Sequence, residues 1–161
     1  MKIKTLLCGI GIMALSSCAG EKAEKLDVDK ALSYCDVQVH RALAELGKNG
    51  EADYSMQPRN ILSGEKFWNC RKVAKEEWTG GFWPGVLWYD YEATQNDTIR
   101  VLAEKYTESL KLFSEIPAYD HDLGFLVFCS YGNGYRLTHN PTYRDVIIAT
   151  CLLYTSPSPR D

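Results

Sequence analysis

The chain has 161 residues, of which 45% are hydrophobic, and it carries a formal net charge of −3. This length and composition predict one domain with a substantial hydrophobic core. Acidic and basic residues are dispersed, and no basic stripe is available to neutralise phosphates, which argues against a nucleic-acid partner. The expected partner is a small molecule or another protein.

Residues 1–17 have the pattern of a secretory signal peptide. Lys2 and Lys4 precede an apolar run of about ten residues, which is too short to span a bilayer as a mature helix. The run ends in "LSSC", which resembles the lipobox of bacterial lipoproteins. In a lipobox the cysteine, here Cys18, is acylated and becomes the new N-terminus.

The alternative is an ordinary signal peptide that happens to contain a cysteine, although an A-x-A cleavage site is lacking. Residues 18–30 are charged and rich in small residues, which is typical of a solvated tether. We therefore expect an exported protein, lipid-anchored to a bacterial membrane on its periplasmic or cell-surface face.

Four cysteines remain after the signal peptide and Cys18: Cys35, Cys70, Cys129 and Cys151. None forms a C-x-x-C pair and no histidine cluster has zinc spacing, so we expect no metal site. Export permits a disulfide, but the sequence alone cannot pair the cysteines. Cys35 and Cys129 lie among apolar neighbours, which predicts buried thiols.

The first helix is predicted from Val28 to Leu46, where apolar residues recur at steps of three and four, and Gly47 ends it. A polar stretch follows to about Gly64 and is predicted to be a loop without structure of its own.

The segment "WTGGFWPGVLWYDYEATQND" predicts a tight loop at Gly80-Gly81 and a helix from Pro84 to Thr94. Asp97 is then predicted to cap a longer helix, which ends before Pro117.

After Asp122 the chain is apolar and aromatic up to Tyr131, and we expect a break at Gly132-Asn133-Gly134. Asn140-Pro141 has the pattern of a cap and first turn for the last helix. Successive helices with short links, without convincing alternation of apolar and polar residues, predict an all-α chain of helical hairpins.

The last helix is followed by "YTSPSPRD", in which two prolines stop helical structure. The tail is either natural and disordered or the product of a truncated gene with non-native final residues. We favour truncation for residues 151–161, because the resemblance described next stops near Cys151.

Two motifs together carry a resemblance: "EEWTGGFWPGVLWYDYEAT", residues 76–94, and "HDLGF", residues 121–125. They resemble the W-T-x-G-F-W-P-G and H-D-x-G-F signatures of glycoside hydrolase family 88, the unsaturated glucuronyl hydrolases. The stretch "YRLTHNPTYRDVIIAT", residues 135–150, is similar to the helix start that follows in that family.

The resemblance implies that residues 31–150 form the N-terminal part of an (α/α)6 barrel, whose early hairpins are present and which is incomplete in this chain. The family removes the terminal 4,5-unsaturated uronic acid from oligosaccharides made by polysaccharide lyases, and it needs no cofactor. Its usual route protonates C4 of the enol ether and adds water at C5, after which the hemiketal opens and expels the rest of the sugar.

By the H-D-x-G-F match, Asp122 is one of the two important aspartates of the family. A carboxyl whose pKa lies near the working pH can serve both as acid and as base. The other aspartate lies beyond the end of this chain, so we expect the chain alone to be inactive. The alternative role for Asp122 is to cap the following helix. Asp120 is expected to cap or to stay solvated, and His121 either orients Asp122 or contacts a sugar hydroxyl.

Trp78 is our first candidate and Trp83 our second for stacking on a sugar, because the family places a tryptophan of this motif in its pocket. The alternative for both is core packing, which is also what we predict for Trp88. A helical glycan-binding lipoprotein without catalysis is the rival function. The related unsaturated rhamnogalacturonyl hydrolases are a second rival, from which the H-D-x-G-F match points away.

Overall fold

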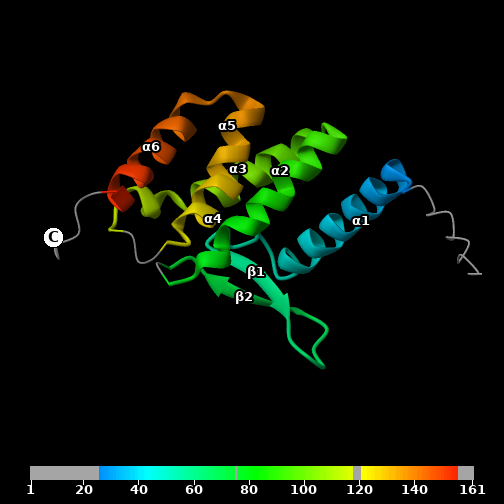
Figure 1. The fold of residues 1–161 in the computed structure, drawn as a ribbon. Coiled ribbons are helices and arrows are strands. Elements are labelled where there is room, and N and C mark those ends of the chain that lie inside the picture. Colours follow the sequence, from blue (N-terminus) through cyan, green and yellow to red (C-terminus); the bar gives the residue numbers. More distant parts are fainter. Residues whose placement is uncertain (1–25, 75, 118–120, 156–161) are drawn as a thin grey trace, which may run out of the picture.

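The computed structural model describes residues 26–74, 76–117 and 121–155. The expected signal peptide, Cys18, most of the tether, Asp120 and the end of the tail lie outside the described residues. Within them the chain is mainly helical, which confirms the all-α prediction, and one small hairpin projects from the helices (Figure 1).

Helix α1 spans Val28–Leu46, as predicted. The side chain of Asp27 accepts a hydrogen bond from the Lys30 amide at 3.0 Å, which satisfies one of the free amides at the helix start. At the other end the Gly47 amide donates to the Leu43 carbonyl and the helix stops. Val39 and Ala42 are the buried residues of α1, and they fix the side that faces the rest of the chain.

The predicted loop after α1, to about Gly64, contains the first strand of a β-hairpin, so that prediction is wrong. Strands β1, Met56–Ile61, and β2, Trp68–Lys72, pair antiparallel in a two-stranded sheet. The register shifts between Pro58 and Asn60, so the pairing carries a bulge. The bulge interrupts side-chain alternation, and the buried positions of β1 are adjacent rather than alternate. No two-residue period therefore marks the strands in the sequence.

Helix α2 spans Phe82–Thr94 and is preceded by a 3₁₀ turn, η1, at Trp78–Gly81. Gly80 and Gly81 are buried in that turn, whereas a tight loop was expected. Helix α3 spans Asp97–Glu108 and is shorter than predicted, with a second 3₁₀ turn, η2, at Lys111–Ser114.

The cap of α3 is one residue earlier than predicted. Asn96, not Asp97, accepts the hydrogen bond from the Thr98 amide, at 3.0 Å. The last helix also begins at an asparagine, because Asn140 accepts from the Thr142 amide at 3.0 Å. This helix, α6, spans Pro141–Thr155 and confirms the predicted Asn140-Pro141 start.

Helix α4, Leu123–Val127, continues through a π-helical turn, η3, at Phe128–Gly132, into α5, Asn133–Thr138. The predicted break at residues 132–134 is therefore wrong. A Cβ on Gly134 would lie 2.7 Å from the Tyr143 ring and 2.9 Å from the Trp88 ring, so this glycine makes room for two aromatic rings. Its small size serves helix packing rather than a turn.

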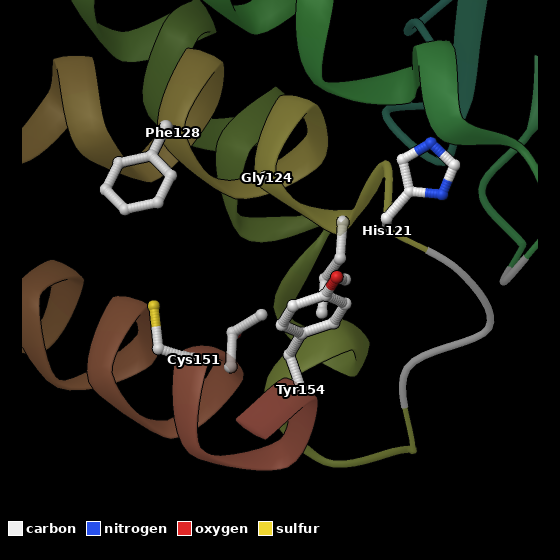
Figure 2. Close-up of a pocket in the computed structure, with 7 residues that line it drawn as sticks. His121, Gly124, Phe128, Cys151 and Tyr154 are labelled. Atoms are coloured by element: carbon white, nitrogen blue, oxygen red, sulfur yellow. The ribbon is translucent and has the colours of Figure 1, made fainter. Parts of the chain in front are cut away.

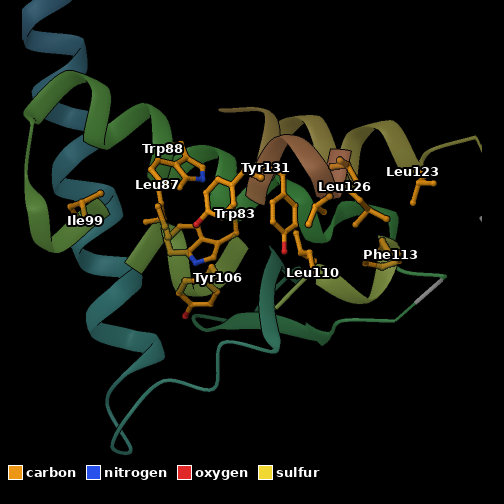
Figure 3. Packing of buried hydrophobic residues seen from close by; sticks show 14 of the residues in the cluster. Trp83, Leu87, Trp88, Ile99, Tyr106, Leu110, Phe113, Leu123, Leu126 and Tyr131 are labelled. Carbon is orange, nitrogen blue, oxygen red and sulfur yellow. The ribbon is translucent and has the colours of Figure 1, made fainter. Parts of the chain in front are cut away.

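The core is formed mainly by α2, α3 and the α4–α5 helix, with large side chains meeting between them (Figure 3). Trp88 is fully buried, as predicted, and its indole N–H donates to Thr107 at 2.9 Å. This bond satisfies a buried donor that would otherwise destabilise the core.

The four described cysteines are free thiols. Cys35 is exposed, which contradicts its predicted burial: α1 packs through Val39 and Ala42, and Cys35 lies beside a groove instead. Cys129 is half-buried, and burial raises the pKa of its thiol.

Two glycines allow α2 to lie directly against the α4–η3 backbone. A Cβ on Gly81 would collide with the Phe125 carbonyl and lie 2.6 Å from the Leu126 Cα. One turn later, a Cβ on Gly85 would lie 2.9 Å from the Cys129 carbonyl. The backbones of the two helices can therefore touch here only because side chains are absent at both glycines.

We expect Gly81→Ala to destabilise the chain by about 3 kcal/mol, because the new methyl group meets backbone that cannot move without separating the helices. Gly124→Ala is the matched control, since a Cβ there has no neighbour within 4 Å. It should leave stability unchanged or raise it by up to about 1 kcal/mol. Denaturant unfolding of the two variants measures the difference, and equal stabilities would contradict the packing argument.

Asp90 is a buried carboxyl at the α1–α2 contact, only 6% exposed. Burial and the negative charge of Asp36 raise its pKa above the ordinary 3.8, and His40 opposes that rise. Its Oδ2 has no hydrogen-bond partner among the described residues. The ionised form is therefore poorly solvated in the folded chain.

We expect Asp90→Asn to raise the melting temperature at pH 7. The unfolded chain loses this proton near pH 3.8 and the folded chain only at higher pH, so the free energy of unfolding falls as pH rises between the two values. The gain should shrink as pH is lowered toward 3.8, because the native carboxyl, whose pKa is the higher of the two, takes up its proton first. Asp97→Asn, on an exposed side chain, is the control, and an equal gain from it would refute the assignment.

Candidate functional site

The two sequence motifs meet at one end of the helical body. Residues 78–81 form η1 at the start of α2, and Asp122 directly precedes α4. The contact of Gly81 with the backbone of Phe125 and Leu126 holds these two helix starts together. The structure thus brings side chains separated by more than forty positions in the sequence to one rim.

Three aromatic rings form a cluster at this rim: Trp78, Phe82 and Phe125. The ring centroids of Trp78 lie 5.7 Å from Phe82 and 5.8 Å from Phe125, and the two phenylalanines are 5.7 Å apart. All three residues are exposed, Trp78 by 37%. Each ring supports the others while keeping surface available, which is the arrangement that stacking on the C–H face of a sugar requires.

Asp122 occupies the N-cap position of α4, but its side chain makes no capping hydrogen bond. The helix-cap alternative therefore does not account for the carboxyl. Its side chain is 24% exposed, and its Oδ1 lies 3.5 Å from Nε2 of His121, whose side chain is 82% exposed. A carboxyl beside an imidazole at an accessible rim can exchange protons with a bound molecule.

Glu77 holds the turn that carries Trp78, and the sequence motifs did not single it out. One carboxyl oxygen accepts from the Thr79 hydroxyl at 2.5 Å, and the other pairs with Arg59 of β1 at 3.2 Å. The side chain of Glu77 is only 14% exposed. It therefore links the hairpin to η1 on both sides of Trp78. Its position directly before the W-T-x-G-F motif was the only sequence signal.

Trp83 is not part of the aromatic cluster at the rim. It is 6% exposed, belongs to the core and packs edge-on against Tyr106, with ring centroids 6.0 Å apart. It also lines a groove of about 350 Å³ between α1, β1 and α2, together with Phe82 and Cys35. Its contact with a sugar stays a prediction.

A second pocket, of about 220 Å³, lies between the start of α4 and the end of α6 (Figure 2). It is lined by His121, Leu123, Gly124, Phe128, Thr150, Cys151 and Tyr154. In Figure 2 the imidazole of His121 points away from the Tyr154 ring. Neither Asp122 nor Trp78 is a lining residue, so this pocket is beside the rim rather than part of it.

Within the described ranges, no group of three or more His, Cys, Asp or Glu side chains is arranged to hold a metal ion. In the described part of the chain, every helix is too short or too polar to cross a membrane.

No protein-family model matches the chain. Curated relatives do. Over 78 residues the chain is 40% identical to the unsaturated glucuronyl hydrolase of Formosa agariphila, a match that covers 48% of this chain and 19% of the relative. Over 74 residues it is 40% identical to the unsaturated chondroitin disaccharide hydrolase of Streptococcus agalactiae, covering 44% of this chain and again 19% of the relative. The matches thus span about a fifth of the relatives' length.

Solved structures agree. A crystal structure of an unsaturated glucuronyl hydrolase specific for heparin matches with a TM-score of 0.65 and 28% identity, over 78% of this chain and 31% of that chain. The unsaturated glucuronyl hydrolase of Streptococcus agalactiae shares the fold with a TM-score of 0.62 over 81% of this chain and 36% of that chain. The fold is thus part of the (α/α)6 barrel, and the chain matches the N-terminal part of glycoside hydrolase family 88, the unsaturated glucuronyl hydrolases.

Proposed function

We propose that this chain contributes the N-terminal part of a hydrolase that removes the terminal 4,5-unsaturated uronic acid from oligosaccharides produced by polysaccharide lyases. The observation that carries the proposal is the meeting of the two motifs: the Trp78 ring packs against Phe125, three residues after Asp122. A stacking surface and an accessible carboxyl therefore share one rim. The names of the curated relatives support the same substrate class.

In this proposal the sugar ring rests on Trp78, and the carboxyl of Asp122 faces the reacting atoms. The reaction is hydration of a vinyl ether, in which C4 gains a proton, water adds at C5, and the hemiketal opens to release the remaining sugar. Such a site needs one group to deliver a proton to carbon and one to take a proton from water. His121, 3.5 Å from Asp122, helps to orient the carboxyl.

The second catalytic aspartate is proposed to lie on a part of the barrel beyond these 161 residues. The chain alone is therefore expected to be inactive, and the activity to require the full-length gene product. An acylated Cys18 would keep this protein at a bacterial membrane, outside the cytoplasm.

The test is the loss of ultraviolet absorbance when the full-length protein meets an unsaturated chondroitin disaccharide. We expect the native protein to abolish the absorbance and Asp122→Asn to lower kcat by about 10² to 10⁴, because proton transfer is lost while the shape is kept. Circular dichroism checks that the variant is folded. A variant that keeps the full rate would make Asp122 a structural residue.

Binding of the disaccharide without any loss of absorbance in the native full-length protein would instead support a glycan-binding lipoprotein. The exposed aromatic cluster is the feature that would serve such a protein.

Trp78→Ala should raise KM about tenfold, because the stacking surface is lost from an exposed position. Trp88→Phe is the control: it loses the buried bond to Thr107 and should lower stability by about 1 kcal/mol with KM unchanged. Steady-state kinetics with thermal unfolding separates the two effects. An unchanged KM for Trp78→Ala would remove this residue from the site, and Trp83→Phe in the same assay tests the second candidate.

A further inference from the structure

The β1–β2 hairpin carries positive charge on a chain that is negative overall. Residues 56–72 contain four basic residues and one acidic residue, a net charge of +3, whereas the whole chain has −3. The loop between the strands and the end of β2 are exposed. The sequence showed dispersed charges, but the hairpin gathers several of them on one projecting element (Figure 1).

Two of these cations, Lys66 and Arg71, are available at the surface, and Lys48, just after α1, lies beside the hairpin loop. We name Lys48, Lys66 and Arg71 the basic hairpin surface. All three are exposed, and none forms an ion pair with the residues that the structure describes. The ammonium of Lys48 lies 4.2 Å from the centroid of the Phe67 ring, which brings this end of α1 to the hairpin loop.

Nearby acidic groups leave this surface largely uncompensated. Glu45 accepts a hydrogen bond from the Trp68 amide at 2.7 Å, and Glu77 pairs with Arg59. Asp53 accepts from Ser55, and Lys72 also helps to lower the pKa of Asp53, so we leave Lys72 out of the surface. Glu65, in the hairpin loop, is the acidic residue that remains beside Lys66.

We propose that the basic hairpin surface binds an anionic polysaccharide, sulfated or carboxylated, outside the rim that holds Trp78 and Asp122. The proposal rests on the proposed function for the chemical class of the glycan. Lys66 lies in the loop just before β2 and Arg71 lies within that strand, so five chain steps hold the two cations at most about 17 Å apart, a spacing that suits a linear polyanion. The pairing of Arg59 with Glu77 shows that this hairpin adjoins the turn of Trp78.

An anionic membrane is the less favoured partner, although Ile61, Leu62 and Phe67 are exposed apolar residues of the hairpin. The Phe67 ring has an ammonium over its face, which opposes its insertion into an apolar layer. The cations also continue along β2 to Arg71, away from the loop that would meet a membrane.

The test measures binding of the full chain to fluorescently labelled chondroitin sulfate by anisotropy, with uncharged dextran for comparison. We expect binding that weakens with added salt, because exposed charges are screened. The triple variant Lys48→Glu, Lys66→Glu, Arg71→Glu should bind about tenfold or more weakly at low salt. The control carries the same change of net charge at Lys30, Lys111 and Arg144, which are exposed elsewhere, and should stay within about twofold of the native chain.

Equal losses in both triple variants would overturn the proposal, because net charge alone would then explain binding. Binding to phosphatidylserine vesicles or duplex DNA, with none to chondroitin sulfate, would also overturn it. The outcome is separable from the proposed function: a full-length protein that binds the polymer through the hairpin but leaves the unsaturated disaccharide intact would contradict only the hydrolase. A full-length triple variant that keeps both activity and polymer binding would contradict only the hairpin surface.

Discussion

The direct contact between α2 and the backbone of α4 and η3 determines where every other feature lies. Gly81 and Gly85 are one helical turn apart, and each faces a backbone carbonyl of the opposing helix. Without a Cβ at either position, the helix axes come close enough for Trp88 to reach the space beside Gly134. A single pair of small residues thereby sets the helix pairing and the packing of the largest core side chain.

The same contact creates the rim. Because the start of α2 is held against the start of α4, the rings of Trp78, Phe82 and Phe125 meet while they are still exposed. Asp122 directly precedes α4 and so lies at the same rim. Glu77 then holds the Trp78 turn from the hairpin side through Arg59 and Thr79. The geometry of the rim thus depends on one backbone contact and one half-buried carboxylate, that of Glu77, neither of which touches a ligand in our proposal.

Much of the helical framework could be predicted from local patterns. The bounds of α1 and the Asn140-Pro141 start of α6 agree with the structure, because apolar spacing and capping residues act within a few positions of where they stand. The errors share a different cause. The hairpin, the burial of Gly81 and the continuity through Gly134 depend on residues distant in the sequence, and a local pattern does not distinguish a glycine in a turn from one under a tryptophan.

The sequence by itself determined the helical class and, through its two motifs, the family resemblance and the candidate residues Trp78, Asp122 and His121. Those conclusions depend on residue types and short spacings. Only the tertiary structure decided that Trp78 is exposed while Trp83 is 6% exposed, that Asp122 makes no capping hydrogen bond, and that Glu77 braces the turn. The physical reason is that exposure and pairing are properties of the neighbours brought in by packing, and the glycine contact between α2 and α4 selects those neighbours.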